Sequence, residues 1–184
     1  IDRSRGLGDV YKRQSPSVDG MSIFEIGSSL PLIKNNDTKK EFLTPKISLR
    51  VNPGNNMKNY STSFKTISAD NVFSINRLGI GDTFEAGKSI TLGIDYKLDY
   101  ENEFYTLENN NEKTQKNKFF EFKLATVLRD VAENEIPTSS TIDKKNSNIF
   151  GTLNNELYEN LKFGYDFSID NDFKTFESHS INTE

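Results

Sequence analysis

The most regular part of the chain is a segment, residues 89–100, in which apolar and polar side chains alternate without a break. Successive side chains of a β-strand point to opposite faces, so this period of two predicts a strand with one apolar and one polar face. A helix would scatter the same apolar residues around its circumference. The apolar face meets either a protein core or lipid. Its residues are Ile90, Leu92, Ile94, Tyr96, Leu98 and Tyr100.

Other segments show similar strand-like patterns, separated by polar connections rich in Asn, Lys and Asp. Together with the first segment they predict roughly seven antiparallel strands. The further segments are 24–32, 43–51, 119–130, 147–157, 161–169 and 173–181.

Strands that run alternately up and down divide the connections into two sets at opposite ends of the sheet. Outer-membrane barrels keep short turns on the periplasmic side and long loops outside, so the set with the longest connection is predicted at the cell surface. That set comprises 53–83, 129–146 and 170–172. The opposite set comprises 33–42, 101–117 and 158–160.

Composition narrows the class of protein. The chain has 184 residues, 34% of them hydrophobic, and a mean hydropathy of -0.66. No apolar run approaches the roughly 18 residues that a membrane-spanning helix needs. A membrane barrel remains compatible, because its polar lumen and loops keep the average low. The net charge of -4 argues against nucleic-acid binding, and the absence of cysteine excludes disulfides and thiolate metal sites within the chain.

The first 14 residues, IDRSRGLGDVYKRQ, are set aside from the fold. They look like translated sequencing adapter, and we expect residues 1–14 to be an artefact that is not native. The alternative is a disordered natural basic terminus. Residues 15–184 are then expected to be a partial barrel domain truncated at both ends, an internal fragment of a longer protein.

Two stretches, FLTPKISLRVNPGNNMKN and DNVFSINRLGIGDTFEAGKSITLGIDY, resemble the barrel region of the LptD family, the lipopolysaccharide-assembly proteins of the outer membrane. A Leu-x-Pro strand start, a long loop with a Phe-Ser-x-Asn-Arg element, a Gly-Asp, an acidic residue, a Gly and a Leu-Gly-x-x-Tyr strand follow in the family's order. The matching positions are Leu43, Pro45, Phe73, Ser74, Asn76, Arg77, Gly81, Asp82, Glu85, Gly87, Leu92, Gly93 and Tyr96, followed by Asp143, Lys145 and Ser147.

This resemblance covers most of residues 40–170, although connection 101–117 is longer than the family pattern. The family's periplasmic domain, cysteines and lateral-gate strands have no counterpart here. The resemblance implies an all-β fold, an antiparallel meander forming an incomplete section of a large transmembrane β-barrel in the cell outer membrane. It further implies transport without catalysis, with lipopolysaccharide, a lipoprotein plug of the LptE type, periplasmic bridge proteins and outer-membrane lipid as partners.

Within such a barrel, the polar face is predicted to line the lumen, where it can hydrogen-bond sugar hydroxyls, phosphates or the plug. The alternative for each residue is simple solvation in a water-filled interior. Aromatic residues of the other face, Tyr96, Tyr100, Phe163, Tyr165 and Phe167, are candidates for interfacial girdles or for an ordinary soluble core. The candidate lumen-facing residues are Lys46, Ser48, Arg50, Ser89, Thr91, Asp95, Lys97, Asp166 and Ser168.

The sequence lacks the residue sets that the candidate enzyme classes require, and no cofactor or metal is predicted. His179 is the only histidine, which leaves no material for a His-dependent triad or a multi-His metal site. Asp95 and Asp99 share one strand face, whereas a glycosidase needs carboxylates across a cleft. Two alternatives of other classes stay open: a different outer-membrane channel of the porin type, and a soluble carbohydrate-binding β-sandwich with a closed apolar core.

Overall fold

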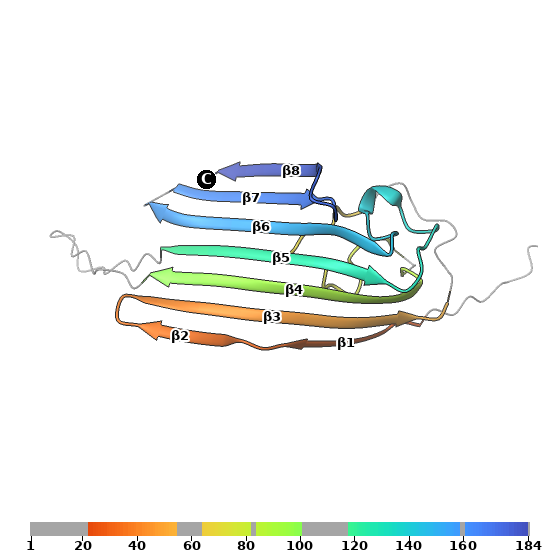
Figure 1. The fold of residues 1–184 in the computed structure, drawn as a ribbon, viewed down its shortest axis with the longest axis horizontal. Helices are drawn as coiled ribbons and strands as arrows, with labels where there is room; N and C mark the ends of the chain where they lie inside the picture. The colour runs from red at the N-terminus through yellow and green to blue at the C-terminus, as the bar shows by residue number, and fades with distance from the viewer. Residues whose placement is uncertain (1–21, 55–63, 82–83, 101–117, 159–160, 184) are drawn as a thin grey trace, which may run out of the picture.

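The computed structural model describes residues 22–54, 64–81, 84–100, 118–158 and 161–183. They form one antiparallel sheet that is not closed (Figure 1), which confirms the all-β prediction. Among these residues, no helix is both long and apolar enough to cross a membrane. The elements are β1 (Phe24–Ser29), β2 (Leu32–Asn36), β3 (Lys39–Asn52), β4 (Gly87–Tyr100), β5 (Phe119–Arg129), the 3-10 helix η1 (Thr138–Ser140), β6 (Asn146–Tyr158), β7 (Leu161–Ile169) and β8 (Phe176–Thr183).

From β3 to β8 the strands follow a meander in which neighbours in the sheet are neighbours in the chain. Their order is β1-β3-β4-β5-β6-β7-β8, with β2 pairing with β3 beyond the end of β1. The longest ladder joins β3 to β4, from Lys39 opposite Tyr100 to Asn52 opposite Gly87. The β3–β4, β5–β6 and β7–β8 connections therefore leave from the same end of the sheet, as the strand parity predicted (Figure 1).

One predicted connection, 33–42, is instead a hairpin between β2 and β3. Its residues are too polar to show alternation, and cross-strand partners such as Lys34 opposite Glu41 support the pairing. The preceding strand stops at Leu30 and Pro31, where the Leu30 amide donates to the Pro45 carbonyl at 3.1 Å. Pro31 has no amide hydrogen, so an edge strand interrupted at this point is the expected outcome.

Burial in the sheet is inverted relative to a soluble protein. On β3, the side chains of Ser48 and Arg50 are buried, whereas Leu49 between them is 45% exposed. On β4, Thr91 is 3% exposed and the adjacent Leu92 is 38% exposed. The alternation predicted from the sequence is therefore present, with the apolar face open and the polar face covered.

The polar face is covered by the connections at one end of the sheet. Residues of the β3–β4 connection fold back onto it and, with the β5–β6 connection, enclose a small apolar core. We call the eight-stranded sheet the wall. Three of its side chains enter this core from the polar face: Ala125 and Val127 of β5 and Phe150 of β6. We call the covering part of the β3–β4 connection, residues 64–81 and 84–86, the inner layer. Its core residues are Ile67, Ala69, Val72, Leu78 and Ile80.

Candidate functional site

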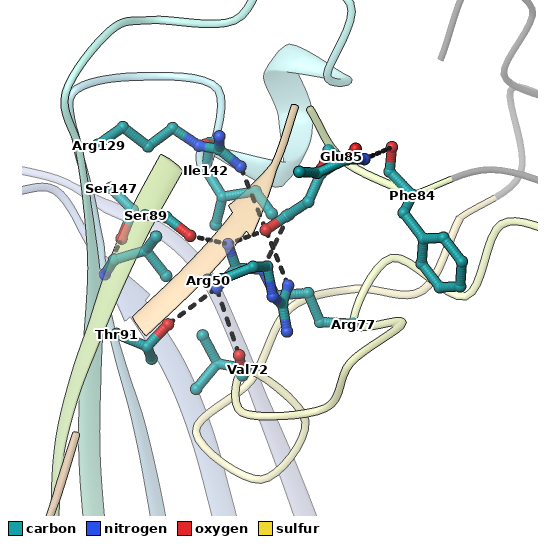
Figure 2. Close-up of polar contacts among 12 residues, drawn as sticks. Arg50, Val72, Arg77, Phe84, Glu85, Ser89, Thr91, Arg129, Ile142 and Ser147 are labelled. Carbon is teal, nitrogen blue, oxygen red and sulfur yellow. Dashed lines mark hydrogen bonds and ion pairs between the residues drawn. The ribbon is translucent and has the colours of Figure 1, made fainter. Parts of the chain in front are cut away.

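The inner layer is held in shape by tight turns. The amides of Val72 and Ser74 donate to the carbonyls of Ser68 and Asn71 at 3.1 and 2.9 Å. The Asn76 side chain donates to the Ile80 carbonyl at 3.0 Å, and Gly79 lies between them with a φ of 65°. A positive φ is favourable for glycine, and this turn leaves Arg77 pointing toward the sheet (Figure 2).

Arg77 reaches a carboxylate buried between the inner layer and the wall, that of Glu85. Arg77 Nε donates to Glu85 Oε2 at 2.9 Å, and its Nη2 donates to Oε1. Arg50 of β3 donates from Nη1 to Oε1 at 2.8 Å, and Arg129 of β5 places Nη2 3.2 Å from the same oxygen. All four side chains are 3% exposed or less. With Glu25 they form what we call the Glu85 cluster.

The three guanidinium groups also bind the surrounding elements (Figure 2). Arg77 donates to Thr91 Oγ1 and Ser89 Oγ of β4 at 3.0 and 3.3 Å. Arg129 donates to the carbonyls of Ile142 and Ala86 at 2.5 and 2.9 Å.

Arg50 extends the cluster to the edge strand. Its Nε and Nη2 both donate to Glu25 of β1, at 3.1 and 2.8 Å. Nη2 also donates to the Ser74 carbonyl at 2.6 Å. The Glu85 cluster therefore joins the inner layer to β1, β3, β4 and β5.

The electrostatic balance favours ionised groups. Burial alone would raise the pKa of Glu85, but the charges of Arg77, Arg129 and Arg50, together with the hydrogen bond from Arg77, hold it below its ordinary value. Burial lowers the pKa of Arg77, and the neighbouring Glu85 carboxylate opposes that shift. Because removing one partner of a buried pair leaves an uncompensated charge, the cluster fixes the geometry of whatever it joins.

Two glycines allow the close approach of the inner layer and the loops to the wall. A Cβ at Gly93 of β4 would lie 2.7 Å from the Phe73 ring of the inner layer. Lys46 Nζ lies 5.7 Å from the centroid of the same ring. At Gly87, φ is 86° and a Cβ would lie 2.7 Å from Glu133 Oε1 of the β5–β6 connection. Any larger residue at either position would displace a side chain packed on it.

A family model, LptD (LPS transport system D), matches residues 4–184. The chain belongs to the LptD family. Comparisons with curated proteins and with solved structures give no match. The family is one of lipopolysaccharide transport in the outer membrane, so this chain has a role in lipopolysaccharide transport.

Most LptD motif positions noted in the sequence lie in or beside the inner layer. Arg77 and Glu85 form the centre of the Glu85 cluster, Asn76 closes the preceding turn, and Gly87 and Gly93 lie under packed side chains. Pro45 and Tyr96 lie elsewhere. Pro45 accepts the hydrogen bond from the edge strand. Tyr96 lies on the apolar face, edge-on to Phe120 at 6.4 Å between ring centroids. Asp82 falls outside the described residues.

The candidate lumen-facing residues divide into two groups. Arg50, Ser89 and Thr91 belong to the covered end, where they contact Arg77 or Glu85. Ser48 donates to Glu25 at 2.8 Å, and Ser168 accepts from Asn148 at 2.9 Å. The partly exposed residues have protein partners as well: Lys46 pairs with Asp95, Lys97 with Asp99 at 2.9 Å, and Asp166 accepts from Thr152 at 2.6 Å.

Sequence reasoning missed Arg129 and Glu25 as members of the cluster. The strand alternation could have indicated Arg129, because this residue falls on the polar face of β5, directly opposite Ser89 of β4. It also missed that Ala125, Val127 and Phe150 break the polar face with apolar side chains, which marks where another part of the chain packs. Among the described residues, no group of three or more His, Asp or Glu side chains is arranged to hold a metal.

Proposed function

We propose that this chain is a section of the wall of an outer-membrane barrel that delivers lipopolysaccharide to the outer leaflet. The observation that carries the proposal is the inverted burial of β3 and β4, with buried Arg50 and Thr91 and exposed Leu49 and Leu92. A soluble sandwich would bury its apolar face, whereas a barrel in lipid exposes it.

The height of the apolar face supports a membrane position. On β4 the apolar face runs from Ile90 to Leu98, and the charged residue Lys88 marks one end of it. At the other end, Lys39 and Glu41 of β3 form a 2.8 Å ion pair. At about 3.4 Å per residue and a strand tilt near 40°, this span measures about 21 Å along the membrane normal, close to the ~25 Å apolar band of outer-membrane barrels.

The polar face then lines the passage for the sugar part of the substrate. Below the inner layer, Asp95, Lys97 and Asp99 alternate in sign along β4, and Glu121 lies opposite Lys97 on β5. All four are only partly buried. Such groups can exchange hydrogen bonds with sugar hydroxyls and phosphates as a substrate passes, while the lipid part remains with the apolar face. Family membership favours this substrate over the general solutes of a porin-like channel.

The proposed partners follow from the same membership. Lipopolysaccharide arrives from periplasmic bridge proteins, a lipoprotein plug of the LptE type occupies the barrel interior, and outer-membrane lipid surrounds the apolar face. Because the β3–β4, β5–β6 and β7–β8 connections leave from one end of the sheet, we assign that end to the cell surface.

Photo-crosslinking in living cells tests this proposal. A benzophenone amino acid replaces Lys97 on the polar face or Leu92 on the apolar face of the complete protein. We expect a lipopolysaccharide adduct at position 97 that disappears when supply from the periplasm is stopped, because only molecules in transit pass there. An adduct at position 92 should persist, because it reflects membrane lipid. Absence of any adduct at 97 during active transport would contradict the proposal.

A further inference from the structure

The inner layer and the wall share one apolar core. Val72 and Leu78 of the inner layer and Val127 of β5 are each 3% exposed or less. A lid that swings away would separate these side chains and expose them to water on every cycle, which opposes the hydrophobic effect that assembled the core. A mobile lid is expected to have few buried apolar contacts, and the inner layer has many.

The charged side chains around Glu85, where the inner layer meets β4, also oppose movement of the inner layer away from the wall. Arg50 and Arg129 belong to the wall strands, and their shared carboxylate, Glu85, belongs to the inner layer. If the inner layer left the wall, Arg129 would lose its contact with Glu85 and its bond to the Ala86 carbonyl. Two guanidinium groups would then remain close together on β3 and β5 without the carboxylate they share, with Glu25 beside Arg50 and with Glu133 and Asp130 near Arg129.

A second set of contacts holds the part of the inner layer that lies away from Glu85. Asp70 Oδ1 lies 2.8 Å from Lys123 Nζ of β5, and the Phe73 ring lies over Gly93 of β4. The inner layer is thus attached to three strands of the wall. Glu85 makes the contacts at one end, and Asp70 and Phe73 make those farther from it. A hinged lid needs one end free.

We propose that the inner layer is a fixed part of the wall, which stays docked while lipopolysaccharide passes beside it over the uncovered polar face. This inference rests on the proposed function. It assigns the passage to the region of Asp95, Lys97 and Glu121 and leaves the space under the inner layer closed throughout the cycle.

Thiol accessibility tests the proposal in cells. Ala69 is 6% exposed in the core under the inner layer, and Ser74 of the same layer is exposed, so Ala69→Cys and Ser74→Cys form a matched pair for a membrane-impermeant maleimide. We expect labelling of Ala69→Cys to be slow and to change less than two-fold when lipopolysaccharide supply is switched on. A rise of ten-fold or more with transport, while Ser74→Cys stays constant, would overturn the proposal.

A covalent lock gives an independent readout. The Asp70 and Lys123 side chains meet, so Asp70→Cys with Lys123→Cys can be bridged by a short bifunctional maleimide. The control pair is Lys34→Cys with Glu41→Cys, which are opposite each other on β2 and β3 at the edge of the wall and lie outside the proposed passage. We expect the locked inner layer to leave lipopolysaccharide delivery within two-fold of the control pair.

A five-fold or greater loss of delivery in the locked protein alone would show that the inner layer must move. Failure of the proposed function is distinguishable, because then the unlocked protein with benzophenone at position 97 would give no lipopolysaccharide adduct. The accessibility and locking results each decide the proposal even if the other variant is poorly assembled.

Discussion

At the scale of single residues, the docking of the inner layer depends on one buried carboxylate. Glu85→Gln would leave Arg50, Arg77 and Arg129 without their shared charge, at a cost of about 3 kcal/mol. The free energy of unfolding, from denaturant titration of the protein in lipid or detergent, measures this loss. Asp70→Asn is the control, because Asp70 is 53% exposed in its pair with Lys123 and should cost less than about 1 kcal/mol.

The pH dependence of the same residue has a definite sign. The folded-state pKa of Glu85 lies below its ordinary value of 4.5, so its stabilisation is fully present above that value and is lost as the pH falls through the lowered one. Protease resistance of the inner layer should therefore stay constant from neutral pH down to about 5 and fall in stronger acid. If Glu85→Gln showed the same acid loss as the wild type, another group would be responsible.

Gly93 gives a second test of docking, because its missing side chain leaves room for the Phe73 ring. Gly93→Ala places a methyl group against that ring and against the Leu124 carbonyl at 3.1 Å, which should cost about 1–3 kcal/mol. Limited proteolysis within residues 64–81 reports the displacement. Adding Phe73→Ala should remove the larger part of the Gly93→Ala loss, which comes from the ring, and leave the smaller part from the Leu124 carbonyl. Equal losses in the two backgrounds would mean that the two residues act independently.

At the scale of the strand, a charge on the apolar face of β4 should cost more in the middle of the strand than at its end. Ile94→Lys puts an ammonium group at the middle of the apolar band, where barrels in lipid lose about 2–4 kcal/mol. Tyr100→Lys, on the same face at the end of the strand, should cost about 0–1 kcal/mol. Refolding into lipid vesicles followed by urea titration compares them. Equal and small effects at both positions would indicate that β4 does not cross a membrane.

The strands themselves were predictable where one face differs consistently from the other, as along β4 and β7. The β2–β3 hairpin was not, because Lys34, Glu41 and their neighbours are polar on both faces and gain order only from pairing. The inner layer was not predictable from the sequence either. A loop rich in Asn and Ser gives no periodic signal, and its core residues, such as Val72 and Leu78, reveal their role only against Val127.

The site was predictable in part. Arg77, Glu85 and Gly93 were noted as motif positions, but nothing in their spacing indicated that they hold the inner layer on the wall. Polar-face residues such as Arg50 and Thr91 were expected to face a lumen, and the structure gives both of them partners in the inner layer. A strand pattern gives the face on which a side chain lies, whereas its partner depends on contacts distant in the sequence.

At the scale of the whole molecule, the apolar face of the sheet is open and the polar face is covered at one end. The connections that cover it gather at that end of the strands (Figure 1). The central claim is that lipid occupies the apolar face. If it does, the edges at β1 and β8 require further strands, because unpaired edges within a membrane leave backbone groups without hydrogen bonds. The inner layer then stiffens the wall from inside.

Spin labels placed one at a time on β4 of the complete protein in lipid vesicles test this claim most directly. Collision with oxygen, which concentrates in lipid, is compared with collision with a water-soluble nickel complex. We predict a high oxygen-to-nickel ratio at Ile90, Leu92 and Ile94 and a low ratio at Asp95 and Lys97. Low ratios at all five positions would place both faces in water or protein and contradict the account.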